Sequence, residues 1–191
     1  MALLEMDADL VAAYRQGDAR AFEQLVQRYE RPLFTYILRM LGNREDAEDV
    51  FQDTVRRILE HMESYEERGK FGSWLFRIAH RLCADRARRS ARWRPLLSRK
   101  IRAEDSDRAR EWADPSPGPD EVLEEKELMD LIACALRRLP PRQREVFLLR
   151  EHSGLRFREI SEIVGRPLNT VLGQMRLATL AVRAALGERT R

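Results

Sequence analysis

Residues 70–89, KFGSWLFRIAHRLCADRARR, constrain the fold more than any other part of this chain. At 100° per residue the large apolar side chains share one helical face, as in a helix that packs on a core: Phe71, Leu75, Ile78 and Leu82. A row of cations shares another face, and it consists of Lys70, Arg77, Arg81 and Arg88. Trp74 lies at the border between the two faces.

This arrangement supports two interpretations. Cations bind phosphate groups without regard to base sequence, and an aromatic ring beside them can stack on an unpaired base. On this interpretation the helix holds single-stranded nucleic acid. The alternative is a solvated basic helix whose tryptophan belongs to the core, and the segment alone does not decide between them.

The composition favours an all-α protein with one domain or two small ones. The 191 residues include only 9 glycines and 8 prolines, and 43% are hydrophobic, which is enough to bury a core. Two cysteines, Cys83 and Cys134, are too few for a disulfide framework. The first residues lack the pattern of a signal peptide, and no stretch is long enough to span a bilayer. We therefore expect a soluble, cytoplasmic protein.

Periodicity predicts three helices before the basic one. Asp7 can cap a short helix that ends at Gly17, and longer helices are expected over 19–41 and 44–61. The last of these carries an acidic face opposite its apolar stripe, formed by Asp46, Asp49, Gln52 and Asp53. Such a face can hold a divalent metal, dock a basic partner or face solvent. The metal site has the least support, because no His or Lys with an evident catalytic role lies nearby.

The loop over 64–70 leads into the basic helix and carries Tyr65. If the loop folds over that helix, Tyr65 approaches Trp74 and completes a small aromatic and basic cluster. The alternative is an ordinary surface tyrosine.

A change of composition divides the chain into an N-terminal domain, 1–90, a flexible linker, 91–119, and a C-terminal domain, 120–191. The linker is basic first and acidic later, and its Pro-Ser-Pro-Gly-Pro run at 115–119 breaks regular structure.

The C-terminal domain contains the pattern of a helix-turn-helix. Helices are expected over 120–139, from Pro141 onward, over 157–164 and over 169–186, and a turn with Gly165 joins the last two. The final helix would present four residues outward, as a helix that reads a DNA major groove does: Asn169, Gly173, Gln174 and Arg176. The alternative is a plain helical hairpin.

Five stretches in order carry a resemblance to a known family: YRQGDARAFEQLVQRY, REDAEDVFQDTV, FGSWLFRIAHRLCADRARR, LRRLPPRQREVFLLREHSGLRFREISEIVGRP and NTVLGQM. At these separations the chain resembles a bacterial RNA polymerase sigma factor of the extracytoplasmic-function (ECF) group of the sigma-70 family. The resemblance covers about residues 7–90 and 120–187. It implies a transcription initiation factor that is not an enzyme, needs no cofactor or metal, recognises −35 and −10 promoter elements and helps open the duplex.

The resemblance also implies a role for each surface. The acidic helix would dock on the clamp coiled coil of the largest subunit of core RNA polymerase through Asp49, Gln52 and Asp53. The loop and basic helix would contact the −10 element through Tyr65, Lys70, Trp74, Arg77, His80, Arg81, Asp85 and Arg88. The helix-turn-helix would rest on the polymerase flap and read the −35 element through Arg166, Asn169, Thr170, Gly173, Gln174 and Arg176. An anti-sigma factor is a common partner in this family, and the sequence leaves its presence open.

The chain departs from the family pattern in three places. Arg81 stands where family members often have Asn, and Leu172, Gly173 and Gln174 stand where two cations are common. Arg156 replaces a Ser helix cap, at a cost of about 1 kcal/mol. These departures affect the expected base preference and leave the expected fold unchanged.

Two other functions remain as alternatives. A stand-alone helix-turn-helix repressor would leave the acidic and basic helices of the N-terminal domain without a shared purpose. A nuclease or recombinase would use Asp46, Asp49 and Asp53 with Mg²⁺. His80 and Cys83 are one helical turn apart, but no second pair completes a metal site with them.

Overall fold

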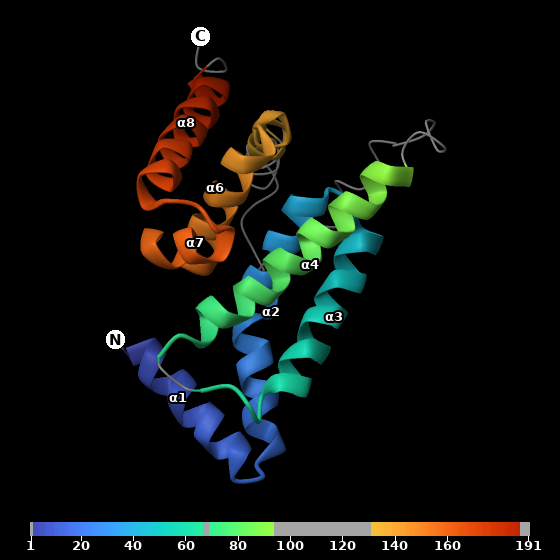
Figure 1. Ribbon diagram of the computed structural model, residues 1–191, viewed down its shortest axis with the longest axis vertical. Helices are drawn as coiled ribbons and strands as arrows, with labels where there is room; N and C mark the ends of the chain where they lie inside the picture. The colour runs from blue at the N-terminus through green and yellow to red at the C-terminus, as the bar shows by residue number, and fades with distance from the viewer. Residues whose placement is uncertain (1, 67–68, 94–130, 188–191) are drawn as a thin grey trace, which may run out of the picture.

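The computed structural model describes residues 2–66, 69–93 and 131–187, and their regular structure is entirely helical (Figure 1). This confirms the all-α class. The helices are α1 (Ala2–Arg15), α2 (Ala19–Leu41), α3 (Arg44–His61), α4 (Phe71–Trp93), α6 (Pro141–Ser153), α7 (Phe157–Val164) and α8 (Leu168–Gly187). Residues 131–138 are also helical.

Side-chain caps and left-handed glycines define the ends of the long helices. Asp18 begins α2 by accepting a hydrogen bond from the backbone N–H of Arg20 at 3.0 Å. Gly42 ends α2 with φ of 79°, and its N–H reaches the Leu38 carbonyl at 2.8 Å. Asn43 then begins α3 by accepting from the N–H of Asp46 at 2.7 Å. These local signals explain why the expected bounds of α2 and α3 match the structure.

The core of the N-terminal domain lies where α2, α3 and α4 pack together. The apolar stripe predicted for the basic helix is confirmed, with Phe71, Leu75 and Leu82 buried and Ile78 partly buried. Phe76, which the predicted stripe omitted, is fully buried against Tyr36 of α2, with ring centroids 5.6 Å apart.

Asp7 does not cap a helix, so that prediction was wrong. It lies in the middle of α1 and is 2% exposed. Its carboxylate pairs with Arg28 of α2 and accepts a hydrogen bond from the Tyr29 hydroxyl at 2.5 Å. Burial and this hydrogen bond raise the pKa of Tyr29. A buried carboxylate requires such partners, and Asp7 therefore joins α1 to α2.

The C-terminal domain contains the predicted helix-turn-helix. Gly165 ends α7 with φ of 64°, and the buried residues Ile160 and Ile163 of α7 lie in the core with Val171 and Ala178 of α8. Arg156 occupies the cap position of α7, where its backbone N–H donates to the Glu159 carboxylate at 2.9 Å. Half of a capping box thus remains although the serine is missing.

The two domains are in contact. α6 packs against α2 and α4, and α7 packs against α4, whereas α3 lies on the far side of α4 (Figure 1). α4 continues to Trp93, past the expected boundary at 90, while 94–119 of the expected linker and 120–130 of the expected helix lie outside the described residues. None of the helices described is both long and apolar enough to cross a membrane.

Candidate polymerase and DNA interfaces

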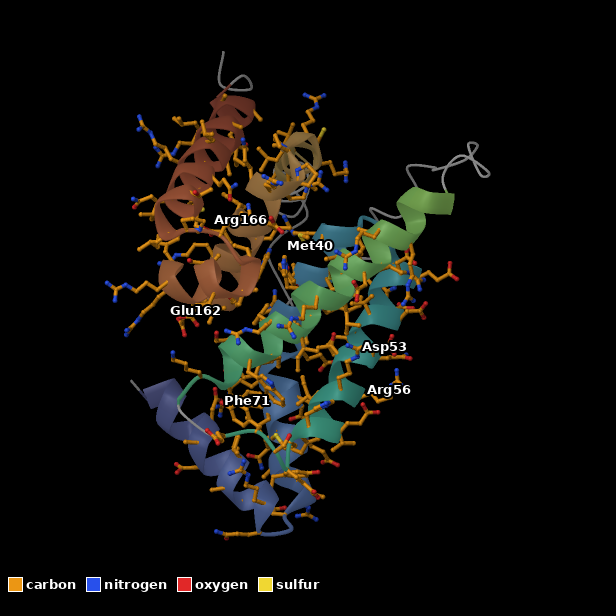
Figure 2. All side chains as sticks on the ribbon, in the orientation of Figure 1. Met40, Asp53, Arg56, Phe71, Glu162 and Arg166 are labelled. Atoms are coloured by element: carbon orange, nitrogen blue, oxygen red, sulfur yellow. The ribbon has the colours of Figure 1, made fainter. Side chains whose placement is uncertain are left out.

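The acidic face of α3 is exposed. Ala47, Val50 and Ile58 turn inward, so Asp49, Gln52 and Asp53 come to the opposite side. The side chains of Asp49 and Asp53 are 57% and 47% exposed. Figure 2 shows Asp53 and its neighbour Arg56 on the side of α3 that is turned away from the C-terminal domain.

Arg86 of α4 organises one end of this acidic face. Its guanidinium pairs with Asp46 and donates to Asp49 at 3.0 Å, and the hydrogen bond to Asp46 is the main reason why its pKa is raised. Asp53 pairs separately with Arg56 at 2.7 Å. These carboxylates therefore meet cations of the chain. In the part of the chain that the structure describes, no three His, Cys, Asp or Glu side chains gather as a metal site would require.

Sequence reasoning missed the role of Arg86, although helical spacing contains a signal for it. Arg86 follows Leu82 by four residues, which places it next to the buried stripe and away from the cationic row. That position turns the guanidinium toward α3.

Trp74 and Tyr65 form the expected aromatic cluster. Their rings stack with centroids 4.5 Å apart and an interplanar angle of 23°, and Phe71 meets Trp74 edge-on at 5.8 Å. Tyr65 is only 8% exposed, whereas Trp74 is partly exposed. The loop thus folds over the start of α4, and part of the Trp74 ring remains accessible.

The cationic row of α4 is divided between solvent and the C-terminal domain. Lys70, Arg81 and Arg88 are exposed, and Arg88 pairs with Asp85 one turn away. Arg77, in contrast, reaches across to α7, where its Nη2 lies 3.4 Å from Oε2 of Glu162.

His80 is also covered by the C-terminal domain. Its Nδ1 lies 3.1 Å from the Tyr36 hydroxyl, and its Nε2 lies 3.7 Å from Oε2 of Glu145 on α6. Burial, with the nearby Arg166 and Arg81, lowers the pKa of His80 to about 4, so the imidazole is neutral at pH 7. The Tyr36 hydroxyl, whose pKa burial raises, then donates to Nδ1, and the Nε2–H faces Glu145.

The helix-turn-helix presents four of its six predicted DNA contacts to solvent: Asn169, Thr170, Gly173 and Arg176. The other two meet each other, because the guanidinium of Arg166 pairs with Gln174 and with Glu145. The outward side of α8 also carries three exposed leucines, Leu172, Leu177 and Leu180. This side of α8 therefore offers few polar side chains that could reach a base edge.

Comparison with known proteins identifies the family. The chain matches the family descriptions "Sigma-70 region 2" over residues 25–94 and "Sigma-70, region 4" over residues 129–178. It is 30% identical to the ECF RNA polymerase sigma-E factor of Haemophilus influenzae over 168 residues, which cover 86% of this chain and 87% of that protein. The chain belongs to the ECF group of sigma-70 factors. It directs RNA polymerase to promoters and is an initiation factor without enzymatic activity.

Other relatives agree with this assignment. The ECF RNA polymerase sigma factor SigW of Bacillus subtilis is 29% identical over 172 residues, 90% of this chain and 92% of that protein. The structure of CnrH, solved in complex with the cytosolic domain of CnrY, matches with a TM-score of 0.65 and 27% identity over 96% of this chain and 98% of that one. The sigma factor RpoE of Bartonella quintana shares the fold, with a TM-score of 0.70 and 20% identity over 88% of this chain and 98% of that one. As a sigma factor, the protein binds core RNA polymerase and promoter DNA, and the repressor and nuclease alternatives are set aside.

Proposed function

We propose that three surfaces of this ECF sigma factor divide the work of promoter recognition. The first is the acidic face of α3, which docks on the clamp coiled coil of the polymerase through Asp49, Gln52 and Asp53. The exposure of this face, on the side of α3 away from the C-terminal domain, supports the assignment. A basic partner surface would complement its charge.

The second surface is α4 with the loop before it, which holds the opened −10 element. The partly exposed ring of Trp74 beside a cationic row is the observation that carries this assignment. Lys70, Arg77, Arg81 and Arg88 would contact phosphates, while Trp74 stacks on an unpaired base with Tyr65 as its support. His80 and Asp85 would lie at the duplex edge.

The third surface is the helix-turn-helix of α7 and α8, which reads the −35 element while the domain rests on the polymerase flap. Asn169, Thr170, Gly173 and Arg176 lie on the solvent side of α8, as a major-groove helix requires. Arg166 and Gln174 join them once Arg166 leaves Glu145.

We also propose that the chain divides into an N-terminal domain, 1–90, a linker, 91–119, and a C-terminal domain, 120–191. The protein acts in the cytoplasm with the polymerase, and an anti-sigma factor controls it. CnrH was solved with the cytosolic domain of CnrY, and the Bartonella protein with the anti-sigma factor NepR. The likeness to CnrH extends over 96% of this chain, so the comparison includes both domains.

In vitro transcription tests this function directly. Fragmented genomic DNA is transcribed by purified core polymerase with and without the protein, and the new 5′ ends are sequenced. We expect new start sites that share elements near −35 and −10. If no start depends on the protein, the proposal fails.

A pair of arginine variants then tests the −35 surface. Arg176→Ala removes an exposed cation of α8, and Arg137→Ala removes another exposed cation outside the helix-turn-helix. Loss of one DNA contact costs about 1–3 kcal/mol, so Arg176→Ala should reduce transcription from these promoters at least fivefold. Equal effects of the two substitutions would reject the assignment of α8.

A further inference from the structure

Four aromatic rings connect α2 to the partly exposed ring of Trp74. The Trp74 ring packs on Tyr65 and on Phe71, and Phe71 also meets Tyr65 edge-on, with centroids 5.8 Å apart. Phe71 lies at the start of α4 (Figure 2), and the centroid of its ring is 5.6 Å from that of Tyr29 on α2. Because Phe71 is only 1% exposed in a close-packed interior, a displacement of Tyr29 would be transmitted toward Trp74.

Tyr29 is itself fixed by contacts with two other helices. Its hydroxyl donates to the Asp7 carboxylate of α1 at 2.5 Å, and Arg28 pairs with the same carboxylate. On α4 the tyrosine meets Gly72, where a Cβ atom would lie 3.0 Å from Oη and 3.2 Å from Cε1 of Tyr29. Any larger residue at position 72 would therefore press on the tyrosine, and α2 approaches the start of α4 as closely as a glycine allows.

Burial makes the bond between Asp7 and Tyr29 a firm constraint. The Asp7 side chain is 3% exposed, and a carboxylate removed from water needs bonded partners, which Arg28 and Tyr29 supply. Burial and the hydrogen bond to Asp7 also raise the pKa of Tyr29, so its hydroxyl stays protonated and remains a donor at neutral pH. The bond therefore fixes the position of the hydroxyl between α1 and α4.

Trp74 needs such support because part of its ring is open to solvent. A side chain that receives a ligand is held in place by the packing of its neighbours. Trp74 lies in the first turn of α4, where its N–H reaches the Lys70 carbonyl at 3.0 Å. A shift of this turn, which Gly72 places against Tyr29, would move the tryptophan ring.

We propose that Asp7 and Tyr29 are positioning residues for promoter opening, which hold Trp74 in the orientation that receives an unpaired base. Neither residue touches the DNA. Asp7 fixes the Tyr29 hydroxyl, and Tyr29 in turn fixes Phe71 and the start of α4. The inference rests on the proposed contact of Trp74 with the −10 element. It gives α1 a part in promoter opening, although none of the residues that we assign to an interface belongs to this helix.

The test compares Tyr29→Phe, which removes only the hydroxyl, with the matched control Phe22→Leu. The Phe22 ring also joins α2 to α1, where it meets Tyr14 with centroids 5.5 Å apart. Both substitutions weaken the contact of α1 with α2, but only Tyr29→Phe removes the hydroxyl that lies against α4. Circular dichroism identifies a temperature at which both full-length variants are folded.

Two properties are then measured with purified core polymerase: the affinity for core, and the permanganate reactivity of unpaired thymines at a promoter found by the transcription experiment. Tyr29→Phe should bind core normally and reduce promoter opening about threefold to tenfold, whereas Phe22→Leu should stay within about twofold of the wild type. Gly72→Ala, which presses on the same tyrosine from α4, should show a similar loss of opening. Normal opening by either folded variant, Tyr29→Phe or Gly72→Ala, would overturn the proposal.

Combination with Trp74→Leu shows whether Tyr29 acts through the tryptophan. Leucine is apolar but cannot stack on a base, so Tyr29→Phe should change opening less than about twofold in this background. The same fold-loss in both backgrounds would mean that Tyr29 has only a general structural role, and the proposal would fail. Trp74→Leu alone reports on the proposed function: if this folded variant opens the promoter normally, Trp74 does not hold a base. Poor opening by Trp74→Leu with normal opening by Tyr29→Phe would reject only the positioning role.

Discussion

The acidic face of α3 and the cationic row of α4 belong to neighbouring helices of one domain, yet their accessibility differs. The side chain of Asp49 is 57% exposed, whereas Arg77 of the row is 38% exposed and pairs with Glu162 of α7, and its neighbour His80 is 12% exposed. The cause is the C-terminal domain, which packs on α2 and α4 and leaves the outer side of α3 uncovered. Periodicity indicates that a helix face is charged, but a distant part of the chain determines whether that face is available.

The difference also separates two kinds of binding. The carboxylates of the acidic face are exposed to solvent, although they already pair with cations of the same domain, Arg86 and Arg56. Arg77, which pairs with Glu162 of α7, would have to leave that carboxylate to contact a phosphate. We therefore expect substitutions on the acidic face of α3 to change polymerase affinity directly, whereas substitutions at Arg77 also change the contact between the domains.

The largest effect is expected on the acidic face. Asp49→Arg with Asp53→Arg reverses two charges, and unfavourable pairing across an interface costs several kcal/mol. Affinity for core polymerase should fall about 100-fold or more, while DNA binding by the free protein should not weaken. Fluorescence anisotropy with labelled protein and purified core measures the change.

Glu23→Arg is the control for this reversal, since it changes an exposed acid on α2 of the same domain. Circular dichroism shows whether the double variant keeps its helices. Core affinity within twofold of the wild type in a folded double variant would remove α3 from the polymerase interface.

A smaller effect is expected at Trp74, the aromatic residue of the cationic helix. Base–aromatic stacking contributes roughly 1–3 kcal/mol, and Trp74→Phe reduces the ring while keeping contact with Tyr65 and Phe71. The folded variant should bind core polymerase normally but open promoter duplex poorly. Permanganate footprinting of unpaired thymines measures the opening.

A mismatched template separates stacking from packing. If Trp74 holds an unpaired base during melting, a −10 region that is already mismatched should restore much of the transcription. Normal opening of native duplex by Trp74→Phe, or no rescue on the mismatched template, would mean that Trp74 serves only to pack the core. Thermal unfolding of the variant shows how much stability the substitution costs.

Much of the fold could be predicted because its signals are local. Asn43 and Gly42 mark the boundary between α2 and α3, and Gly165 ends α7, so these bounds follow from capping chemistry. Asp7 shows where this reasoning fails. A cap residue and a buried carboxylate look alike in sequence, and only the position of Arg28 and Tyr29 on another helix distinguishes them.

The candidate sites were predictable where one helix contains the whole pattern. The acidic face and the cationic row each repeat with the helical period, and Tyr65 lies close enough in sequence to Trp74 for their contact to be expected. Glu145 and Glu162 gave no such signal. Their partners are 65 and 85 residues away, and the charge of a single glutamate does not indicate which cation it meets.

The smallest expected effect is a pH dependence of the contact between the two domains, which covers His80 and His152. Burial lowers the pKa of His80 and of His152 to about 4, with Arg166 near the first and Arg39 of α2 near the second. Separation of α6 from α2 and α4 would expose both imidazoles and return their pKa toward the ordinary value of about 6.5. Because the pKa is lower while the domains are in contact, the contact is most stable above pH 6.5 and weakens as the pH falls toward 4.

At pH 5.5, protonation should weaken the contact between the domains by about 1 kcal/mol per histidine. Glu145 opposes this trend, because burial raises its pKa and its protonation favours the contact at low pH. His152→Gln isolates the contribution of this histidine to the pH dependence. The pKa of His152 is lowered by burial and by the nearby Arg39, and Glu145 is not among the causes. The radius of gyration of the wild type should therefore increase between pH 7.5 and 5.5 more than that of His152→Gln.

His61→Gln, at an exposed position on α3, should behave as the wild type does. An equal pH response in all three proteins would mean that His152 is not buried by the contact between the domains, and that the difference between the two faces does not depend on its protonation.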